Sequence, residues 1–283
     1  MRQLLKQLQE MQHDFSPSKK SVAEYILKHY SDIPFQTISQ VAALTSTSEA
    51  TITKLCKELG FTGFSELKGL IGQHVNSTLT MDSKLLRVAS GLGEGALLES
   101  TLSNEVLNIQ TTLRNEENIK AIPVSISMID SASHVYTIGS RTSAFFAGLF
   151  AFKLRQQGIN VSHIEWGIGD YIEKVMMIKP GDLVIAFSFA RFTKNTVKVL
   201  RVLKEKHISI ILFTGEGLSP AYEYADLVFV CRTDFHSYVA SYTACLSLIN
   251  AILAARAVQH KEHVETHLRE LEANFELFDI FTG

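Results

Sequence analysis

The chain has 283 residues, of which 46% are hydrophobic and 20% are charged, so it is long enough to bury one large core or two cores of unequal size. Its net charge of −2 excludes a general attraction to polyanions, and any contact with nucleic acid must therefore come from a local patch. The cysteines, Cys56, Cys231 and Cys245, lie far apart in apolar stretches, which argues against a disulfide framework and against a zinc site. We expect buried thiols, no metal and no cofactor.

The N-terminal stretch MRQLLKQLQE has helical periodicity and carries charges throughout, unlike the apolar core of a signal peptide. The longest apolar run, AFFAGLFAF at 144–152, is too short to cross a bilayer. These features predict a cytoplasmic protein that does not contact a membrane.

Two different periodicities divide the chain. Up to about residue 75, apolar residues recur at intervals of three and four with no strand-like run, which predicts an all-helical domain at 1–75. After about residue 119, apolar β-branched runs such as DLVIAFS and ISIILFT alternate with stretches of helix length, which indicates a parallel sheet with crossover helices at 119–283. The segment between them, 76–118, is predicted to be a linker that contains a helix.

The linker helix is predicted from four apolar residues at helical spacing: Leu102, Val106, Ile109 and Leu113. Glycines in the preceding stretch GLGEG make residues 91–95 the best candidate for a hinge.

Three helices are predicted in the N-terminal half. The first begins at Ser16 and Pro17 and runs to about Tyr30. The second is the short stretch TISQVAA, and the third is SEATITKLCKELG, which Gly60 closes. The buried face of the third helix is predicted to consist of Ile52, Leu55, Cys56 and Leu59.

The second and third helices, joined by the polar turn LTSTS, have the layout of a helix-turn-helix. The face of the third helix opposite its core carries the candidate DNA-binding residues Thr47, Ser48, Ala50, Thr51, Lys54 and Lys57. Small side chains near the start of such a helix can approach base edges, and lysines further along can contact phosphates. Because basic and acidic residues are nearly balanced in 1–75, charge alone leaves a helical dimerisation module equally open.

The stretch from SPSKKSVAEYIL through LGFTGFSELK resembles the N-terminal domain of RpiR-type regulators, which join a helix-turn-helix to a sugar isomerase (SIS) domain. The resemblance implies a two-domain fold, an all-α helix-turn-helix domain followed by an α/β SIS domain with a parallel sheet flanked by helices. It also implies a double-stranded DNA operator as partner. One departure is Lys54, where the family usually has arginine, because lysine keeps the charge but lacks the forked donors that specify guanine.

In the C-terminal half, two predicted strands are each followed by a loop rich in hydroxyls that leads into a helix. Ser140 and Ser143 follow HVYTIG, whereas Ser188 and Thr193 follow DLVIAF. Ligands of parallel sheets bind beyond the carboxyl ends of the strands, and helix N-termini supply amides and a favourable dipole for an anion. Each hydroxyl taken alone has helix capping as an equal alternative, but the paired arrangement favours a ligand site.

These two loops resemble those of phosphosugar-binding SIS domains, which read roughly G-x-G-x-S and S-x-S-G-x-T. Gly139 and Ser143 match the first pattern, and Ser188 and Thr193 match the second. The resemblance implies a phosphorylated or acidic sugar as the effector.

The chain departs from both patterns, because Arg141 and Arg191 replace glycines and Ala190 replaces a serine. Losing the glycines limits close backbone approach to a phosphate, yet each arginine adds a charge and several N–H donors. We expect an anion to be held by the arginines more than by the backbone. The alternative is that one or both arginines point to solvent or to carboxylates across a dimer.

Glu165 follows the second predicted strand and is a candidate to bind sugar hydroxyls or act as a base, with a surface carboxylate as the alternative. The last helix is predicted to run unbroken from about Ser241 through HVETHLRELEANFELF. Its amphipathic pattern suits an interface, so we expect a homodimer or higher homo-oligomer that sets two reading helices on a palindromic operator.

The sequence is compatible with three functions. The favoured one is a transcriptional regulator of carbohydrate metabolism, not an enzyme, that senses a phosphorylated or acidic sugar. The second is an aldose-ketose phosphosugar isomerase with a helical accessory domain, for which Glu165 is the one nearby base candidate and has no identifiable partner. The third is a sugar-binding module that regulates a protein partner.

Overall fold

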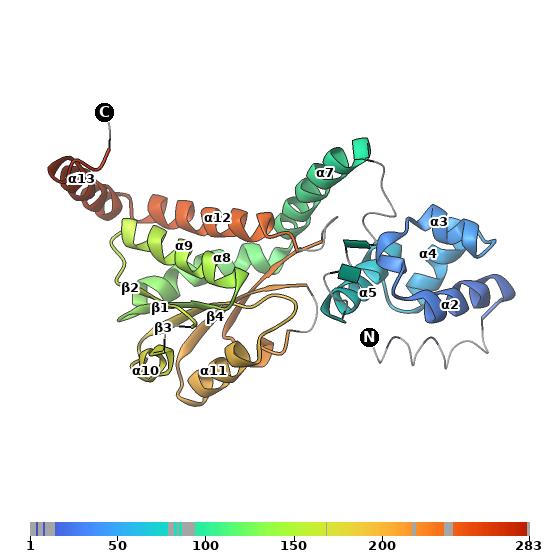
Figure 1. The fold of residues 1–283 in the computed structure, drawn as a ribbon, viewed down its shortest axis with the longest axis horizontal. Helices are drawn as coiled ribbons and strands as arrows, with labels where there is room; N and C mark the ends of the chain where they lie inside the picture. The colour runs from blue at the N-terminus through green and yellow to red at the C-terminus, as the bar shows by residue number, and fades with distance from the viewer. Residues whose placement is uncertain are drawn as a thin grey trace. The chain divides into compact units, whose positions relative to one another are not determined.

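The computed structural model describes residues 4, 8, 15–78, 82–83, 85–86, 94–167, 169–216, 219–234 and 240–281 (Figure 1). The chain divides into two compact units, Met1–Leu97 and Leu98–Gly283. Of the hinge candidate at 91–95, residues 91–93 lie outside the described part, and Glu94 and Gly95 begin a helix.

The described part of the first unit is helical. Its elements are α2 (Pro17–His29), the 3-10 turn η1 (Ile33–Phe35), α3 (Ile38–Leu44), α4 (Glu49–Glu58) and α5 (Phe64–Thr78). The predicted inner face of α4 is confirmed, because Ile52, Leu55 and Cys56 are fully buried and Leu59 is nearly so. They pack in one core with Val22 and other apolar residues of the unit.

Local hydrogen bonding sets where these helices begin and end. The Thr37 side chain accepts from the Gln40 amide, and the Gln40 side chain accepts from the Thr37 amide, which forms a capping box at the start of α3. Ser48 caps α4 by accepting from the Thr51 amide. Gly60, at a φ of +90°, follows α4 and confirms the predicted stop.

The second unit contains a five-stranded parallel sheet in the order β2-β1-β3-β4-β5. The strands are β1 (Val135–Gly139), β2 (Val161–Ile164), β3 (Leu183–Phe187), β4 (Ser209–Gly215) and β5 (Leu227–Cys231). Its helices are α7 (Glu94–Leu113), α8 (Glu116–Ser131), α9 (Thr142–Gln156), α10 (Tyr171–Met176), α11 (Lys194–Glu205), η2 (Tyr222–Tyr224), α12 (Thr243–Gln259) and α13 (Lys261–Leu277). The predicted α/β architecture is thereby confirmed.

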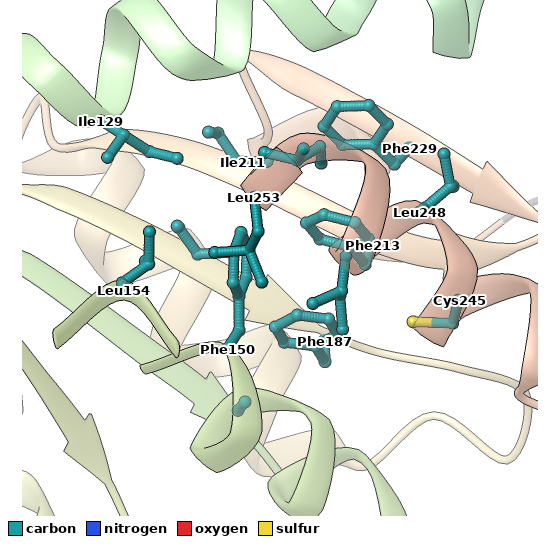
Figure 2. Packing of buried hydrophobic residues seen from close by; sticks show 14 of the residues in the cluster. Ile129, Phe150, Leu154, Phe187, Ile211, Phe213, Phe229, Cys245, Leu248 and Leu253 are labelled. Carbon is teal, nitrogen blue, oxygen red and sulfur yellow. The ribbon is translucent and has the colours of Figure 1, made fainter. Parts of the chain in front are cut away.

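Helices cover both faces of this sheet (Figure 1). On the side of α8, α9 and α12, the rings of Phe187, Phe213 and Phe229 stack across three neighbouring strands, with centroids 4.7 and 4.8 Å apart (Figure 2). Phe150 of α9 meets the first two of these rings edge-on. The opposite face is covered by α10 and α11, which bury Val175 and Leu200 against it.

The prediction of one unbroken last helix is wrong. The chain forms two separate helices, α12 and α13 (Figure 1). His260 between them has a non-helical backbone with φ −115° and ψ 39°. His260 Nε2 lies 2.6 Å from Asp130 Oδ2, and the buried Arg256 donates to Asp130 Oδ1 at 2.9 Å. The apolar periodicity of the sequence continues across this break. The break could therefore not be predicted from it, because the contacts of His260 and Arg256 with α8 leave no trace in that periodicity.

All three cysteines are buried free thiols, as predicted. Burial raises the pKa of the Cys56 thiol to about 11. Within the described residues, no helix has the length and apolar character needed to span a membrane.

Candidate functional site

The six candidate DNA-binding residues surround the start and outer face of α4. Ser48, Ala50, Lys54 and Lys57 are exposed. Thr47 and Thr51 are half-buried. The positions are therefore largely open to a partner, as a reading helix requires.

Several of these side chains also form hydrogen bonds that stabilise the turn before α4 and the first turn of α4. The Thr47 hydroxyl lies 2.8 Å from that of Thr45, and the Ser48 hydroxyl lies 3.0 Å from that of Thr51. Within the described residues, neither Lys54 nor Lys57 has an ion-pair partner. These two ammonium groups are consequently free to meet phosphates.

The hydroxyl-bearing loops after β1 and β3 lie at the topological switch point of the sheet. The chain passes from β1 to β2 on one side and then returns to place β3 on the other side of β1. Gly139 at the end of β1 pairs in register with Phe187 at the end of β3, so Ser140 and Ser188 leave neighbouring strands at the same level. Open parallel sheets bind their ligands at this crevice.

Thr196, on the first turn of α11, joins the two loops. Its hydroxyl lies 2.8 Å from that of Ser140 and 2.7 Å from that of Thr193, and its side chain is buried. Thr196 was not predicted from the sequence, although its position three residues after Thr193 places both near the start of one helix. The N-cap residues Arg141 of α9 and Thr193 of α11 make no side-chain capping bond, so capping does not account for this cluster.

Ser143 and Ser188 are buried at the same edge of the sheet, with 7% and 4% of their surface exposed. Their hydroxyls have no hydrogen-bond partner among the described residues. Gly139 permits the tight turn after β1, because a Cβ at that position would lie 2.4 Å from the Ser143 carbonyl oxygen.

Arg141 and Arg191 both have left-handed backbones, with φ values of 57° and 62°. This conformation explains why the family pattern has glycine at both positions, and it costs an arginine about 1–3 kcal/mol. Both residues are exposed. Neither guanidinium pairs with a carboxylate in the described part of the chain, so both remain available to an anion.

Glu165 is exposed just beyond β2 and has no hydrogen-bond partner among the described residues. Its charge acts on His163, whose pKa is lowered chiefly by burial. The His163 Nδ1 atom lies 3.1 Å from the Thr137 hydroxyl. The hydroxyl cluster and Glu165 thus follow different strands, and no hydrogen bond within the described part of the chain joins them.

The two parts of the chain match two known domains. The helix-turn-helix domain of the rpiR family matches residues 2–77, and the SIS domain matches residues 127–255. The chain belongs to the RpiR family of transcriptional regulators. The resemblance on which the fold and the function were predicted is thereby confirmed.

Relatives of this chain are also named as transcriptional regulators. YbbH of Bacillus subtilis, an uncharacterized HTH-type transcriptional regulator, is 27% identical over 210 residues, which cover 73% of this chain and 72% of YbbH. The HTH-type transcriptional regulator HexR of Pseudomonas aeruginosa is 22% identical over 279 residues, which cover 96% of this chain and 95% of HexR. This RpiR-family protein is therefore a DNA-binding transcriptional regulator, and the relatives favour that reading over the isomerase.

Solved structures share the fold. The sugar isomerase domain of an RpiR transcription factor from Sphaerobacter thermophilus has 27% identity and a TM-score of 0.59, covering 62% of this chain and 98% of that domain. The Vibrio vulnificus NanR protein, solved in complex with ManNAc-6P, has 19% identity and a TM-score of 0.59, covering 99% of this chain and 100% of NanR.

Proposed function

We propose that this regulator binds a phosphorylated or acidic sugar at the carboxyl ends of β1 and β3, and that binding changes its affinity for an operator. The observation that carries the proposal is the hydroxyl chain from Ser140 through Thr196 to Thr193 at the switch point of the sheet. NanR, which shares the fold, is solved with the phosphosugar ManNAc-6P, and this supports a ligand of that class.

The anionic group of the effector would lie between the start of α9 and the start of α11, where both helix dipoles are favourable. Ser143 and Ser188 would donate their free hydroxyls to it. Arg141 and Arg191 would supply positive charge from the rim of the site. Glu165 would accept hydrogen bonds from sugar hydroxyls further from the anion.

In this proposal residues 1–75 contact DNA through the outer face of α4, residues 76–118 are the linker and residues 119–283 hold the effector. A homodimer, or a higher oligomer, would present two copies of α4 to successive major grooves of a palindromic operator. We infer that this regulator acts in the cytoplasm. An effector shifts DNA affinity only if it binds two conformations of the protein unequally.

The experiment is a titration of the full chain against its own upstream DNA and a scrambled fragment at one fixed salt concentration, with and without a pool of sugar phosphates and sugar acids. We expect preference for the upstream fragment, and we expect the pool to alter that preference. Two variants serve as internal controls. K54A/K57A should lose DNA affinity and still bind the effector, whereas T196V should bind DNA and respond to the pool only at about five- to tenfold higher concentration. Equal, weak binding to both fragments under every condition would refute the proposal.

A further inference from the structure

Helix α7 buries polar side chains against its own domain and exposes apolar ones. Asn108 and Thr112 are 0% and 4% exposed, whereas Leu102 and Val106, from its predicted apolar face, are 57% and 53% exposed. The contacts that position α7 on the domain are therefore directional hydrogen bonds, which respond to small displacements of their partners.

These hydrogen bonds connect α7 to residues 232–234, the segment that follows the edge strand β5. The Asn104 and Asn108 amides, one turn apart, both donate to the Asp234 carbonyl, at 2.8 and 2.7 Å. The Arg232 amide donates to the Thr112 hydroxyl at 2.9 Å. Successive turns of α7 are thus hydrogen-bonded to one short segment that follows β5 at the carboxyl ends of the strands.

The same helix also holds the residue just before α12. The Ser241 hydroxyl donates to the Glu105 carboxylate, and Ser241 is 8% exposed. Figure 1 shows the start of α12 beside α7, in agreement with this contact. The neighbouring residue, Tyr242, is therefore fixed in position relative to α7.

Tyr242 contacts the loop after β3 and α9, the helix that follows the loop after β1. Its ring centroid lies 5.1 Å from that of Phe189 and 5.1 Å from that of Phe146. Phe189 directly follows Ser188, and Phe146 comes three residues after Ser143 on α9. A change in the spacing of the two loops must consequently be accommodated by the Tyr242 ring, since closely packed side chains transmit displacements.

We propose that the Ser241–Tyr242 step is the link that carries effector occupancy from these loops to α7, an inference that rests on the proposed function. An anion that draws the loops together moves Phe146 and Phe189 against Tyr242. Ser241 moves with Tyr242, and its bond to Glu105 shifts α7, which leads along the chain to the DNA-binding domain. This link is a continuous chain of described contacts.

The test is hydrogen–deuterium exchange on the full-length protein, first without any ligand. S241A removes the donor and E105A removes the acceptor of the connecting bond. S247A is the matched control, because among the described residues the Ser247 hydroxyl bonds only to the Thr243 carbonyl of its own helix. We expect S241A and E105A each to speed exchange about tenfold or more in both 98–113 and 188–196, the factor that loss of a hydrogen bond to a charged group produces, and S247A to leave both segments unchanged. Faster exchange confined to 241–245 would overturn the proposal.

A second series uses inorganic phosphate as the probe at constant ionic strength. In the wild-type protein we expect phosphate to slow exchange in 140–143, in 188–196 and in α7, and in S241A and E105A to slow it in the loops alone. Equal protection of α7 in the variants, or protected loops with an unaffected α7 in the wild-type protein, would contradict the link. If phosphate protects neither loop, the anion site of the proposed function fails, and the ligand-free comparison alone then decides the link.

Discussion

The Ser140 hydroxyl lies 2.8 Å from the Thr196 hydroxyl, and this contact joins the loop after β1 to the first turn of α11. Both loops of the candidate effector site are therefore held by one buried side chain. Replacing it tests the site without touching either arginine.

We expect T196V to weaken binding of a sugar phosphate about five- to tenfold, because the isosteric side chain cannot bond to Ser140 or Thr193. T196S should retain most of the affinity, since it keeps the hydroxyl. Calorimetric titration with the effector found in the DNA experiment measures both. Equal affinities for T196V and the wild-type protein would remove the hydroxyl chain from the site.

Substitutions at Arg191 separate its charge from its backbone strain. R191A and R191G both remove the guanidinium, so each should weaken effector binding about tenfold or more, as expected for loss of a charged hydrogen bond. Only R191G relieves the left-handed φ of 62°. R191G should therefore be about 1 kcal/mol more stable than R191A in urea unfolding. Identical unfolding midpoints would show that the backbone at this position is not strained.

Lys54 is predicted to contact a DNA phosphate. K54A should weaken binding to the native and the scrambled fragments alike, and it should reduce the slope of log affinity against log salt by about one. The exposed Lys20 of α2 provides the control, because K20A should leave that slope unchanged. A K54A variant that loses affinity for the native fragment alone would instead assign Lys54 to base reading.

Arg256 holds the junction between α12 and α13. Its guanidinium donates to Asp130 at 2.9 Å and to the Gln157 side chain at 3.1 Å, and only 4% of the side chain is exposed. R256A should lower the free energy of unfolding by about 2 kcal/mol, because it leaves the buried Gln157 oxygens without their Arg256 donor. R269A, which breaks an exposed pair with Glu265, should leave the urea midpoint nearly unchanged.

Stability should fall as the pH falls through the range below 6.5. Burial lowers the pKa of His163 from its ordinary value of 6.5, so the unfolded chain takes up this proton before the folded protein does. The stability lost between pH 7.5 and 5.5 in urea unfolding should therefore be smaller in H163Q than in the wild-type protein. A variant that keeps the full pH dependence would show that other groups cause it.

Most of the helices and strands could be predicted from short-range patterns in the sequence. The helices of the first unit and the strands of the second were predicted from apolar periodicity, because that periodicity reports which face of each element is buried. The single last helix was wrong for the same reason, since periodicity contains no information on the pairing of His260 with Asp130.

The amino-acid sequence by itself determined the helical and strand segments, the family motifs and the strand ends from which a ligand site was predicted. Tertiary structure alone decided which side chains meet there. Ser140 and Thr196 are 56 positions apart and become partners only because β1 and β3 are neighbours in the sheet. It also decided that α7 turns its polar side inward, because the groups it meets are the backbone N–H and C=O groups beyond edge strand β5, which need hydrogen bonds rather than apolar cover.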